Sequence, residues 1–367
     1  MYLCPTAEQQ EIKDAVRRFC QERISAERLG AWEKEARGVD DVFWKSVSEL
    51  GWFGFGLPAA VGGSARGLTD VACLLEECGR GLVPRRVINA IRNGVILAGL
   101  GVGDELLSGM ARGERAVSFA CDEQNASDPE SFQTRIVAHD GADCVDGEKW
   151  YVADAMEADF HVVAAREGSG VTLALVQAQA ARSTALRTTA LRAFDGERQA
   201  IVRYDRVPVR QRLCPPGQGA QSLAVIRREQ TALALAEMVG GMDAVLAMTV
   251  AYVKEREQFG QKIAVFQAVQ HQVADMATAF TAARHLAWQA ITRLAAGSAE
   301  GWELVTSAAF VGQAFKRVSL SALHLHGGAG YVVEHPLHYH AERAQSLCIR
   351  HAPEGPALAE VAKTLLD

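Results

Sequence analysis

Residues 227–276 decide the fold, and they read RREQTALALAEMVGGMDAVLAMTVAYVKEREQFGQKIAVFQAVQHQVADM. The stretch sits in a part of the chain for which we predict one long helix over roughly 222–257, a second over 264–296 and a third over 299–325. These helices are apolar over much of their surface. Helices of this kind pack in a bundle, and the excess apolar surface indicates an oligomer.

The pattern changes twice toward the N-terminus. The first third is expected to be helical, and Thr6 with Gln9 three residues later has the pattern of a helix-starting capping box. From near Glu114 the chain breaks into short runs of strand-forming residues, which end near Pro208 or the Pro215-Pro216 pair.

This order predicts an α+β fold in three parts. The predicted parts are an N-terminal all-α domain at 1–113, a middle β-barrel or β-sandwich domain at 114–213 and a C-terminal four-helix-bundle domain at 214–367.

Composition excludes several classes of protein. With 49% hydrophobic and 22% charged residues, the 367-residue chain has the composition of a soluble globular protein. A net charge of −6 argues against nucleic-acid binding, which needs a basic face. The eight cysteines form no CxxC pair or zinc-like cluster and many fall inside apolar runs, so we expect reduced, buried thiols in a cytoplasmic protein without a metal site. No stretch approaches the roughly 18 uninterrupted apolar residues of a membrane span.

Two local motifs have both a structural and a functional interpretation. The glycines of Gly327-Gly328-Ala329-Gly330 could end a helix, or they could let the backbone approach a phosphate closely. Arg256 could be a solvated helix-end arginine, or its guanidinium fork could bind a pyrophosphate.

Several phrases together resemble the acyl-CoA dehydrogenase family, in the family's order and spacing. Besides residues 227–276 they are GWFGFGLPAAVGG (51–63), LLEECGRGLVP (74–84), GEKWYVADAMEADFHVVAAR (147–166), YDRVPV (204–209) and LHLHGGAGYVVEHPLHYHAERA (323–344). The resemblance covers nearly the whole chain. It implies FAD as cofactor, an acyl-CoA thioester as substrate, an electron-transfer flavoprotein or similar electron acceptor, and a dimer or tetramer of like or unlike subunits. It also implies that a carboxylate removes the α-proton while the β-hydride passes to the flavin.

The resemblance leaves the catalytic base open. Counting from Gly327 places His351 where the family has its C-terminal glutamate, and Glu354 follows three residues later. Other family members carry the base earlier, at a position that Gln230 occupies here, beside Glu229. Glu354, Glu229 and His351 are therefore the alternative candidates.

The two halves of the implied cofactor site differ. The resemblance gives Asp122, Tyr151 and Ala153 positions beside the chain's own flavin ring, but Asp122 and Ala153 replace threonines and Tyr151 replaces a tryptophan. By contrast, the residues that resemble those reaching the neighbouring subunit's FAD are retained: Arg256, Phe259, Gln267, Gly327, Gly328 and Gly330.

Three enzyme hypotheses follow from this asymmetry. The chain could be the partner subunit of a heteromeric dehydrogenase, since it resembles the short subunits of the enzymes that degrade steroid side chains. It could instead be a self-sufficient homo-oligomeric dehydrogenase with a displaced base. A flavin oxidase or monooxygenase of the same fold is the third hypothesis, and a flavin-free structural protein is a further, non-enzymatic one.

Overall fold

The structure, a computed structural model, describes residues 5–124, 128–178, 185–215, 217–298, 301–353, 355, 358–359 and 362. The chain forms two compact units. The first consists of the chain up to Ala31, Gly67–Val83 and the chain from Gln230 onward, and the second consists of Trp32–Arg66 and Pro84–Glu229. Helix α8 (Gly219–Glu255) contributes to both.

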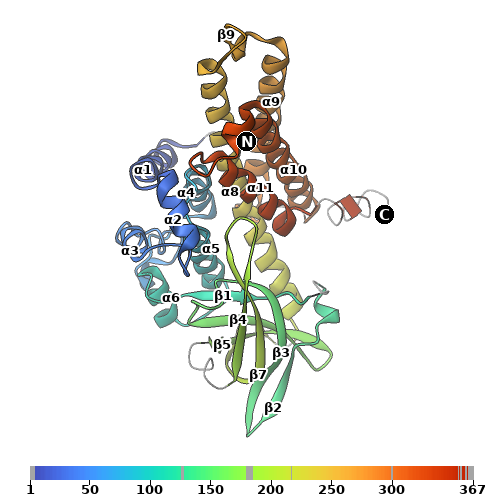
Figure 1. The fold of residues 1–367 in the computed structure, drawn as a ribbon. Coiled ribbons are helices and arrows are strands. Elements are labelled where there is room, and N and C mark those ends of the chain that lie inside the picture. The colour runs from blue at the N-terminus through green and yellow to red at the C-terminus, as the bar shows by residue number, and fades with distance from the viewer. Residues whose placement is uncertain are drawn as a thin grey trace. The chain divides into compact units, whose positions relative to one another are not determined.

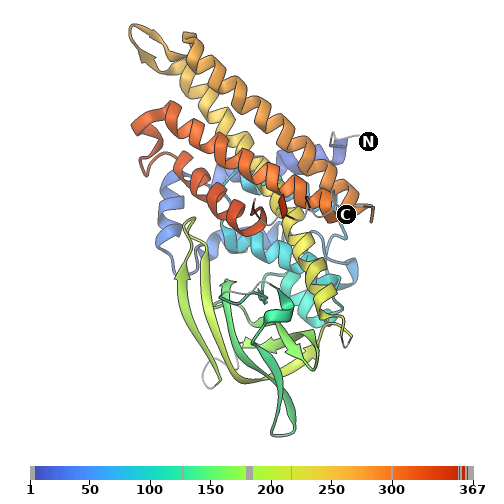
Figure 2. The same cartoon turned by 90° about the vertical axis from the view of Figure 1, so that its right-hand side faces the viewer.

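The first unit is helical, and in Figures 1 and 2 its long helices α8, α9 and α10 run beside one another. Its helices besides α8 are α1 (Ala7–Arg23), most of α2 (Ala26–Lys34), α4 (Leu68–Arg80), α9 (Gln267–Ala295), α10 (Gly301–His326), α11 (Leu337–His351) and the 3-10 turns η3 (Ile263–Val265) and η4 (Gly327–Gly330). A two-stranded hairpin, β8 (Glu257–Gln258) with β9 (Gln261–Lys262), joins α8 to α9.

Helices α4 and α8 touch through glycine. A Cβ atom on Gly240 would lie 1.7 Å from the Glu76 carbonyl oxygen, and one on Gly79 would lie 2.1 Å from the Glu237 carbonyl oxygen. Only glycine permits such an approach of two backbones. Buried ion pairs flank this crossing, and Lys13 Nζ lies 2.6 Å from Glu76 Oε1.

The second unit combines short helices with a sheet. Its helices are the end of α2 (Ala26–Lys34), α3 (Asp41–Glu49), η1 (Ala59–Val61), α5 (Arg85–Ala98), α6 (Asp104–Ala111) and η2 (Pro129–Ser131). Its strands are β1 (Val117–Ala120), β2 (Arg135–His139), β3 (Ala142–Ala153), β4 (Phe160–Glu167), β5 (Gly170–Gln177), β6 (Leu186–Arg192) and β7 (Arg198–Arg212).

The sheet closes into a barrel. Strands β4, β2, β3, β7 and β5 pair in that order and β5 pairs back to β4, while β1 and β6 extend the edges of β4 and β7. Alternate residues of β4 serve two cores: Val163 faces one with Tyr204, and Val162 faces another that includes Leu107 and Ile226. The period of two along the strand explains how one strand is buried on both faces.

The predicted architecture is confirmed. The family's order of an N-terminal helical part, a middle β part and C-terminal helices is present, and the three predicted C-terminal helices correspond to α8, α9 and α10. The predicted domain ranges stay a prediction, because the compact units group α1 and α4 with the C-terminal helices.

Two composition-based expectations can be compared with the structure. The cysteines among the described residues are free and buried, as predicted, and burial raises the pKa of Cys20 to about 12. Helix α8 alone in the described part is long and apolar enough to cross a membrane, but 72% of its most apolar window is buried in the protein. The core helix of a soluble protein has the same properties.

Candidate functional site

Arg256 directly follows helix α8; its backbone is hydrogen-bonded and its side chain is exposed. The Arg256 amide donates to the Tyr252 carbonyl at 2.8 Å, which continues the last helical turn, and the Arg256 carbonyl accepts from Ile263 N at 2.9 Å. The Arg256 side chain is exposed, and its guanidinium makes no ion pair within the described residues. Its donors are therefore available to an anion.

The hairpin after Arg256 displays an aromatic ring. Its two turn residues have positive φ angles, 55° at Phe259 and 79° at Gly260, which is the pattern of a type I′ turn. Phenylalanine rarely adopts such a φ angle. Phe259 is also 92% exposed. Its ring and the Phe266 ring form a T-shaped pair, with 6.1 Å between centroids. A strained, exposed aromatic residue is typical of a contact with another molecule.

The glycine motif lies at the same end of the first unit. Tyr252 stacks on His326 with 4.3 Å between ring centroids, and its hydroxyl donates to the His326 carbonyl at 3.3 Å. Nothing lies within 4 Å of a Cβ built on Gly327 or Gly328, whereas Gly330 is buried. The φ angle of 57° at Gly327 also favours glycine.

A further contact joins this end to α9. The His324 Nδ1 atom lies 3.3 Å from Gln272 Oε1, five residues after the exposed Gln267 that begins the helix. We call this set the arginine–glycine edge, and its members are Arg256, Phe259, Gln267, Gly327, Gly328 and Gly330. A guanidinium, an amide and open glycine backbone are together suited to binding a diphosphate.

In the second unit, Asp122 is part of an ion pair. Arg227 Nη2 donates to Asp122 Oδ1 at 2.8 Å, and both side chains are partly exposed. The Asp122 carbonyl accepts from Trp150 N at 2.9 Å, which holds the end of β1 against β3. The positive charge of Arg227 therefore offsets the negative charge of the Asp122 carboxylate.

Tyr151 and Ala153 lie on an irregular stretch of β3. The register of β3 on β7 shifts between Lys149 and Val152, and Tyr151 has a φ angle of 55° and is 46% exposed. Ala153 pairs with Gln199 and has no polar side-chain atom to offer a ligand. The structure thus brings Asp122, Tyr151 and Ala153 to one sheet. Of these three side chains, Asp122 is already ion-paired, Tyr151 carries a hydroxyl group and Ala153 has no polar atom.

The candidate base Glu229 lies in the first turns of α8. Burial raises the pKa of Glu229, and the neighbouring Arg228 opposes that shift. Successive helix residues are about 100° apart, so Glu229 projects about 160° away from Arg227, which binds Asp122. Gln230 projects only about 60° away from Arg227 on the same count. The helix therefore directs Glu229 away from the Asp122 side.

The other two candidates lie at the C-terminus. His351 is the last residue of α11 and is partly buried. Glu354 lies outside the described residues.

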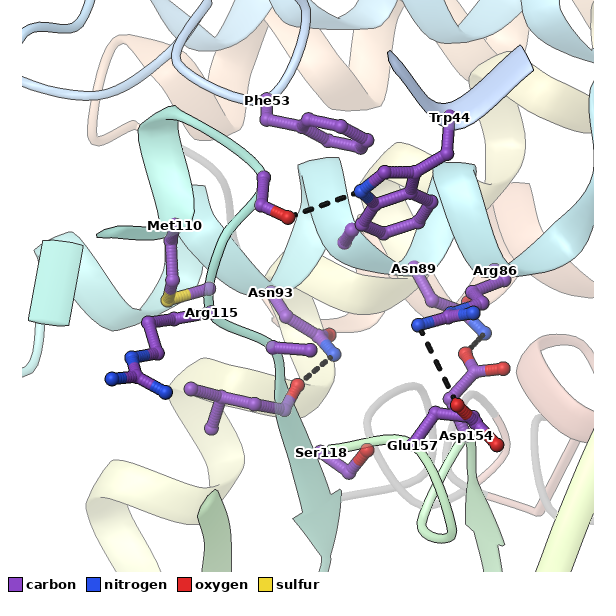
Figure 3. A pocket seen from close by; sticks show the side chains of 14 residues that line it. Trp44, Phe53, Arg86, Asn89, Asn93, Met110, Arg115, Ser118, Asp154 and Glu157 are labelled. Carbon is purple, nitrogen blue, oxygen red and sulfur yellow. Dashed lines mark hydrogen bonds and ion pairs between the residues drawn. The ribbon is translucent and has the colours of Figure 1, made fainter. Parts of the chain in front are cut away.

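A small pocket in the second unit has a cavity volume of about 20 Å³ (Figure 3). Asn89 Nδ2 donates to Asp154 Oδ2 at 2.8 Å there, and Arg86 lies above the Trp44 ring with 4.6 Å to its centroid. A cavity of this size holds about one water molecule. It is too small for a substrate.

The family models and similar proteins agree with this architecture. The model described as "Acyl-CoA dehydrogenase, N-terminal domain" matches residues 6–108, and the model described as "Acyl-CoA dehydrogenase, C-terminal domain" matches residues 223–356. Benzylmalonyl-CoA dehydrogenase from Aromatoleum aromaticum is 31% identical over 348 residues, which cover 90% of this chain and 91% of that protein.

The chain belongs to the acyl-CoA dehydrogenase family. Members of the family are FAD-dependent oxidoreductases that dehydrogenate acyl-CoA thioesters, and this is the activity class of the chain. Among solved structures, the Tcur3481–Tcur3483 steroid acyl-CoA dehydrogenase is 26% identical with a TM-score of 0.88, covering 98% of each chain. Butyryl-CoA dehydrogenase from Megasphaera elsdenii shares the fold, with 20% identity, a TM-score of 0.89 and 100% of each chain covered.

The residues present fit part of an FAD molecule well and part of it poorly. The unpaired Arg256 guanidinium and the open space at Gly327 and Gly328 suit the diphosphate. Ala153 offers no side-chain hydroxyl for a hydrogen bond to a flavin ring.

Sequence reasoning did not find Arg227, although it changes the interpretation of Asp122. The two residues are 105 positions apart, and nothing local in the sequence links them. It also did not find the Tyr252–His326 stack, which joins α8 to the glycine motif.

Proposed function

We propose that this chain acts as the partner subunit of a heteromeric acyl-CoA dehydrogenase. In this assembly it supplies the arginine–glycine edge, while the other subunit supplies the catalytic base. The observation that carries the proposal is that neither base position holds a carboxylate, because His351 and Gln230 occupy them. The adjacent Glu229 projects to another side of α8.

The chemistry of the reaction is consistent with one subunit supplying the base and the other supplying the arginine–glycine edge. A base must lie within hydrogen-bonding reach of the α-proton, and a carboxylate with a suitable pKa removes it. When bound, FAD accepts the β-hydride. In our proposal Arg256 binds the diphosphate of an FAD held mainly by the other subunit, the glycines give that diphosphate access to backbone amides, and Phe259 covers it from water.

One similar solved structure supports a two-protein assembly and a class of substrate, and a second shares the fold. The Tcur3481–Tcur3483 structure is titled a steroid acyl-CoA dehydrogenase, and the ChsE4–ChsE5 structure from Mycobacterium tuberculosis is titled a complex. The latter is 22% identical to this chain with a TM-score of 0.90, covering 100% of this chain and 99% of that one, and it bears on the fold alone. We propose a fatty-acyl or steroid-side-chain CoA thioester as substrate and an electron-transfer flavoprotein as electron acceptor.

The Arg256→Ala substitution tests the proposal in the complex that co-purifies with the tagged chain from its native cells. A hydrogen bond to a charged group contributes about 1.5–3 kcal/mol, so FAD affinity of the complex is expected to fall by about 10- to 150-fold. The measurement is flavin fluorescence during dilution of the complex. Lys254→Ala is the matched control, because Lys254 is an exposed cation two residues away. Unchanged FAD affinity in Arg256→Ala would contradict the proposed role of the edge.

One observation favours a second candidate, a self-sufficient homo-oligomer that uses Glu229. Burial raises the pKa of Glu229, which is the direction of shift expected for a carboxylate that accepts a proton in catalysis. This candidate requires flavin reduction by an acyl-CoA in the isolated chain, and it requires Glu229→Gln to abolish that reduction while FAD stays bound.

A further inference from the structure

The first unit contains a pocket that is separate from the arginine–glycine edge. It has a cavity volume of about 320 Å³ and lies among α1, α2, α4, α8 and α11, helices that Figure 1 labels. This volume is at the lower end of the range of roughly 300–1,000 Å³ for small-molecule sites. The pocket is therefore large enough for a small organic molecule, but not for an acyl-CoA.

The walls of the pocket are mainly apolar. They include the side chains Cys20, Ile24, Leu29, Leu82, Ala244, Ala247 and Met248. An apolar ligand body would lose contact with water on entering, which is the main favourable contribution to binding in such a pocket.

One polar side chain in the wall has no partner. His340 lines the pocket and is 2% exposed, and its Nδ1 atom has no hydrogen-bond partner among the described residues. Burial, with smaller contributions from Arg343 and Arg80, lowers the pKa of His340 to about 3. The imidazole is therefore neutral at physiological pH, and a buried polar atom without a partner costs free energy that a ligand can recover.

The charged groups of the pocket neutralise one another. Arg17 donates to both carboxylate oxygens of Glu77, at 2.9 and 2.7 Å, and Arg80 is paired with Asp243. Among the described residues that line the pocket, every charged side chain is paired, which favours an uncharged ligand.

We propose that this pocket binds a small uncharged molecule with an apolar body and one hydroxyl group, which hydrogen-bonds to His340. A neutral imidazole nitrogen can accept the hydroxyl hydrogen or donate to its oxygen, so an alcohol or a phenol satisfies either tautomer. The proposal is independent of the heteromeric function proposed above, because none of its residues belongs to the arginine–glycine edge.

The test compares two molecules of one shape, 4-tert-butylphenol and 4-tert-butyltoluene, with the purified full-length chain in its native oligomer. Binding is followed by saturation-transfer NMR. A neutral hydrogen bond contributes about 0.5–1.5 kcal/mol, so the phenol is expected to bind about 2- to 12-fold more tightly than the toluene derivative. In His340→Leu this ratio is expected to fall to about one.

A second variant closes the pocket without changing the histidine. Ala247→Phe is expected to abolish binding of both molecules, whereas Ala251→Phe, on the same helix but outside the pocket lining, is expected to preserve it. If His340→Leu fails to fold, Ala247→Phe still decides whether the molecules occupy this pocket. The proposal is overturned if the phenol does not bind the wild-type oligomer, if Ala247→Phe binds it unchanged, or if folded His340→Leu keeps the preference for the phenol.

Discussion

Asp154 follows strand β3 and is a partly buried carboxylate in a polar network. Asn89 Nδ2 donates to Asp154 Oδ2 at 2.8 Å and to Glu197 Oε1 at 3.0 Å, so one amide bridges two carboxylates. Burial, and then the charge of Glu197, raises the pKa of Asp154 to about 6. Such a carboxylate binds its proton more tightly in the folded state than in the unfolded state.

The resulting pH dependence has a defined sign. Because the folded-state pKa of Asp154 lies above its ordinary value of 3.8, its protonation stabilises the fold below about pH 4, and this contribution disappears as the pH rises through about 6. Asp154→Asn is expected to raise the free energy of unfolding at pH 7 by about 2–3 kcal/mol relative to wild type, since one pKa unit corresponds to about 1.4 kcal/mol. The measurement is urea denaturation at pH 4.5 and pH 7. A difference between the two proteins that does not grow with pH would disprove this role of Asp154.

Some residues of the candidate site could be predicted from the sequence and others could not. The exposed Arg256 and the open Gly327 could be anticipated, because both stand in motifs that are recognisable within a few residues. The Arg227–Asp122 pair could not, because it depends on how the start of α8 meets the end of β1. The unpartnered His340 was not anticipated either, since burial of a histidine depends on tertiary packing.

At the scale of elements, the crossing of α4 and α8 depends on two glycines. A Cβ on Gly240 would overlap the Glu76 carbonyl oxygen, and this atom belongs to backbone that cannot rotate away. An alanine in mid-helix gains about 1 kcal/mol over glycine in helix propensity, but overpacking against a backbone costs more.

We therefore expect Gly240→Ala to destabilise the protein by about 1–2 kcal/mol net, as measured by chemical denaturation. Gly67→Ala is the control, because nothing lies within 4 Å of a Cβ at Gly67 and its φ angle is −72°. The control is expected to cost less than about 1 kcal/mol. Equal effects of the two substitutions would show that the helices do not approach as closely as described.

The elements themselves were largely predictable. The capping box at Thr6 was expected from its spacing to Gln9, and both of its hydrogen bonds are present. The long apolar runs placed α9 and α10 within about three residues of their ends. The barrel closure was less accessible, since β4 pairs with β2 and β5 pairs with β7, and no local pattern relates the strands of these two pairs.

At the scale of the whole molecule, the order of parts was predictable but the grouping of the chain was not. Order follows from local periodicity, which changes near Glu114 and again before α8. Grouping follows from long-range contacts such as the crossing of α4 and α8, and these place α1 and α4 with the C-terminal helices. The partner subunit could not be predicted from local periodicity either. We infer it because the arginine–glycine edge is retained while neither base position holds a carboxylate.

The most direct test of the partner-subunit account is the visible absorbance spectrum of the chain expressed alone, before and after addition of a panel of acyl-CoA thioesters. We predict clearly less than one FAD per chain and no bleaching of the flavin band, because the chain has no carboxylate at either base position. One FAD per chain that bleaches with an acyl-CoA would contradict the account and identify a self-sufficient dehydrogenase.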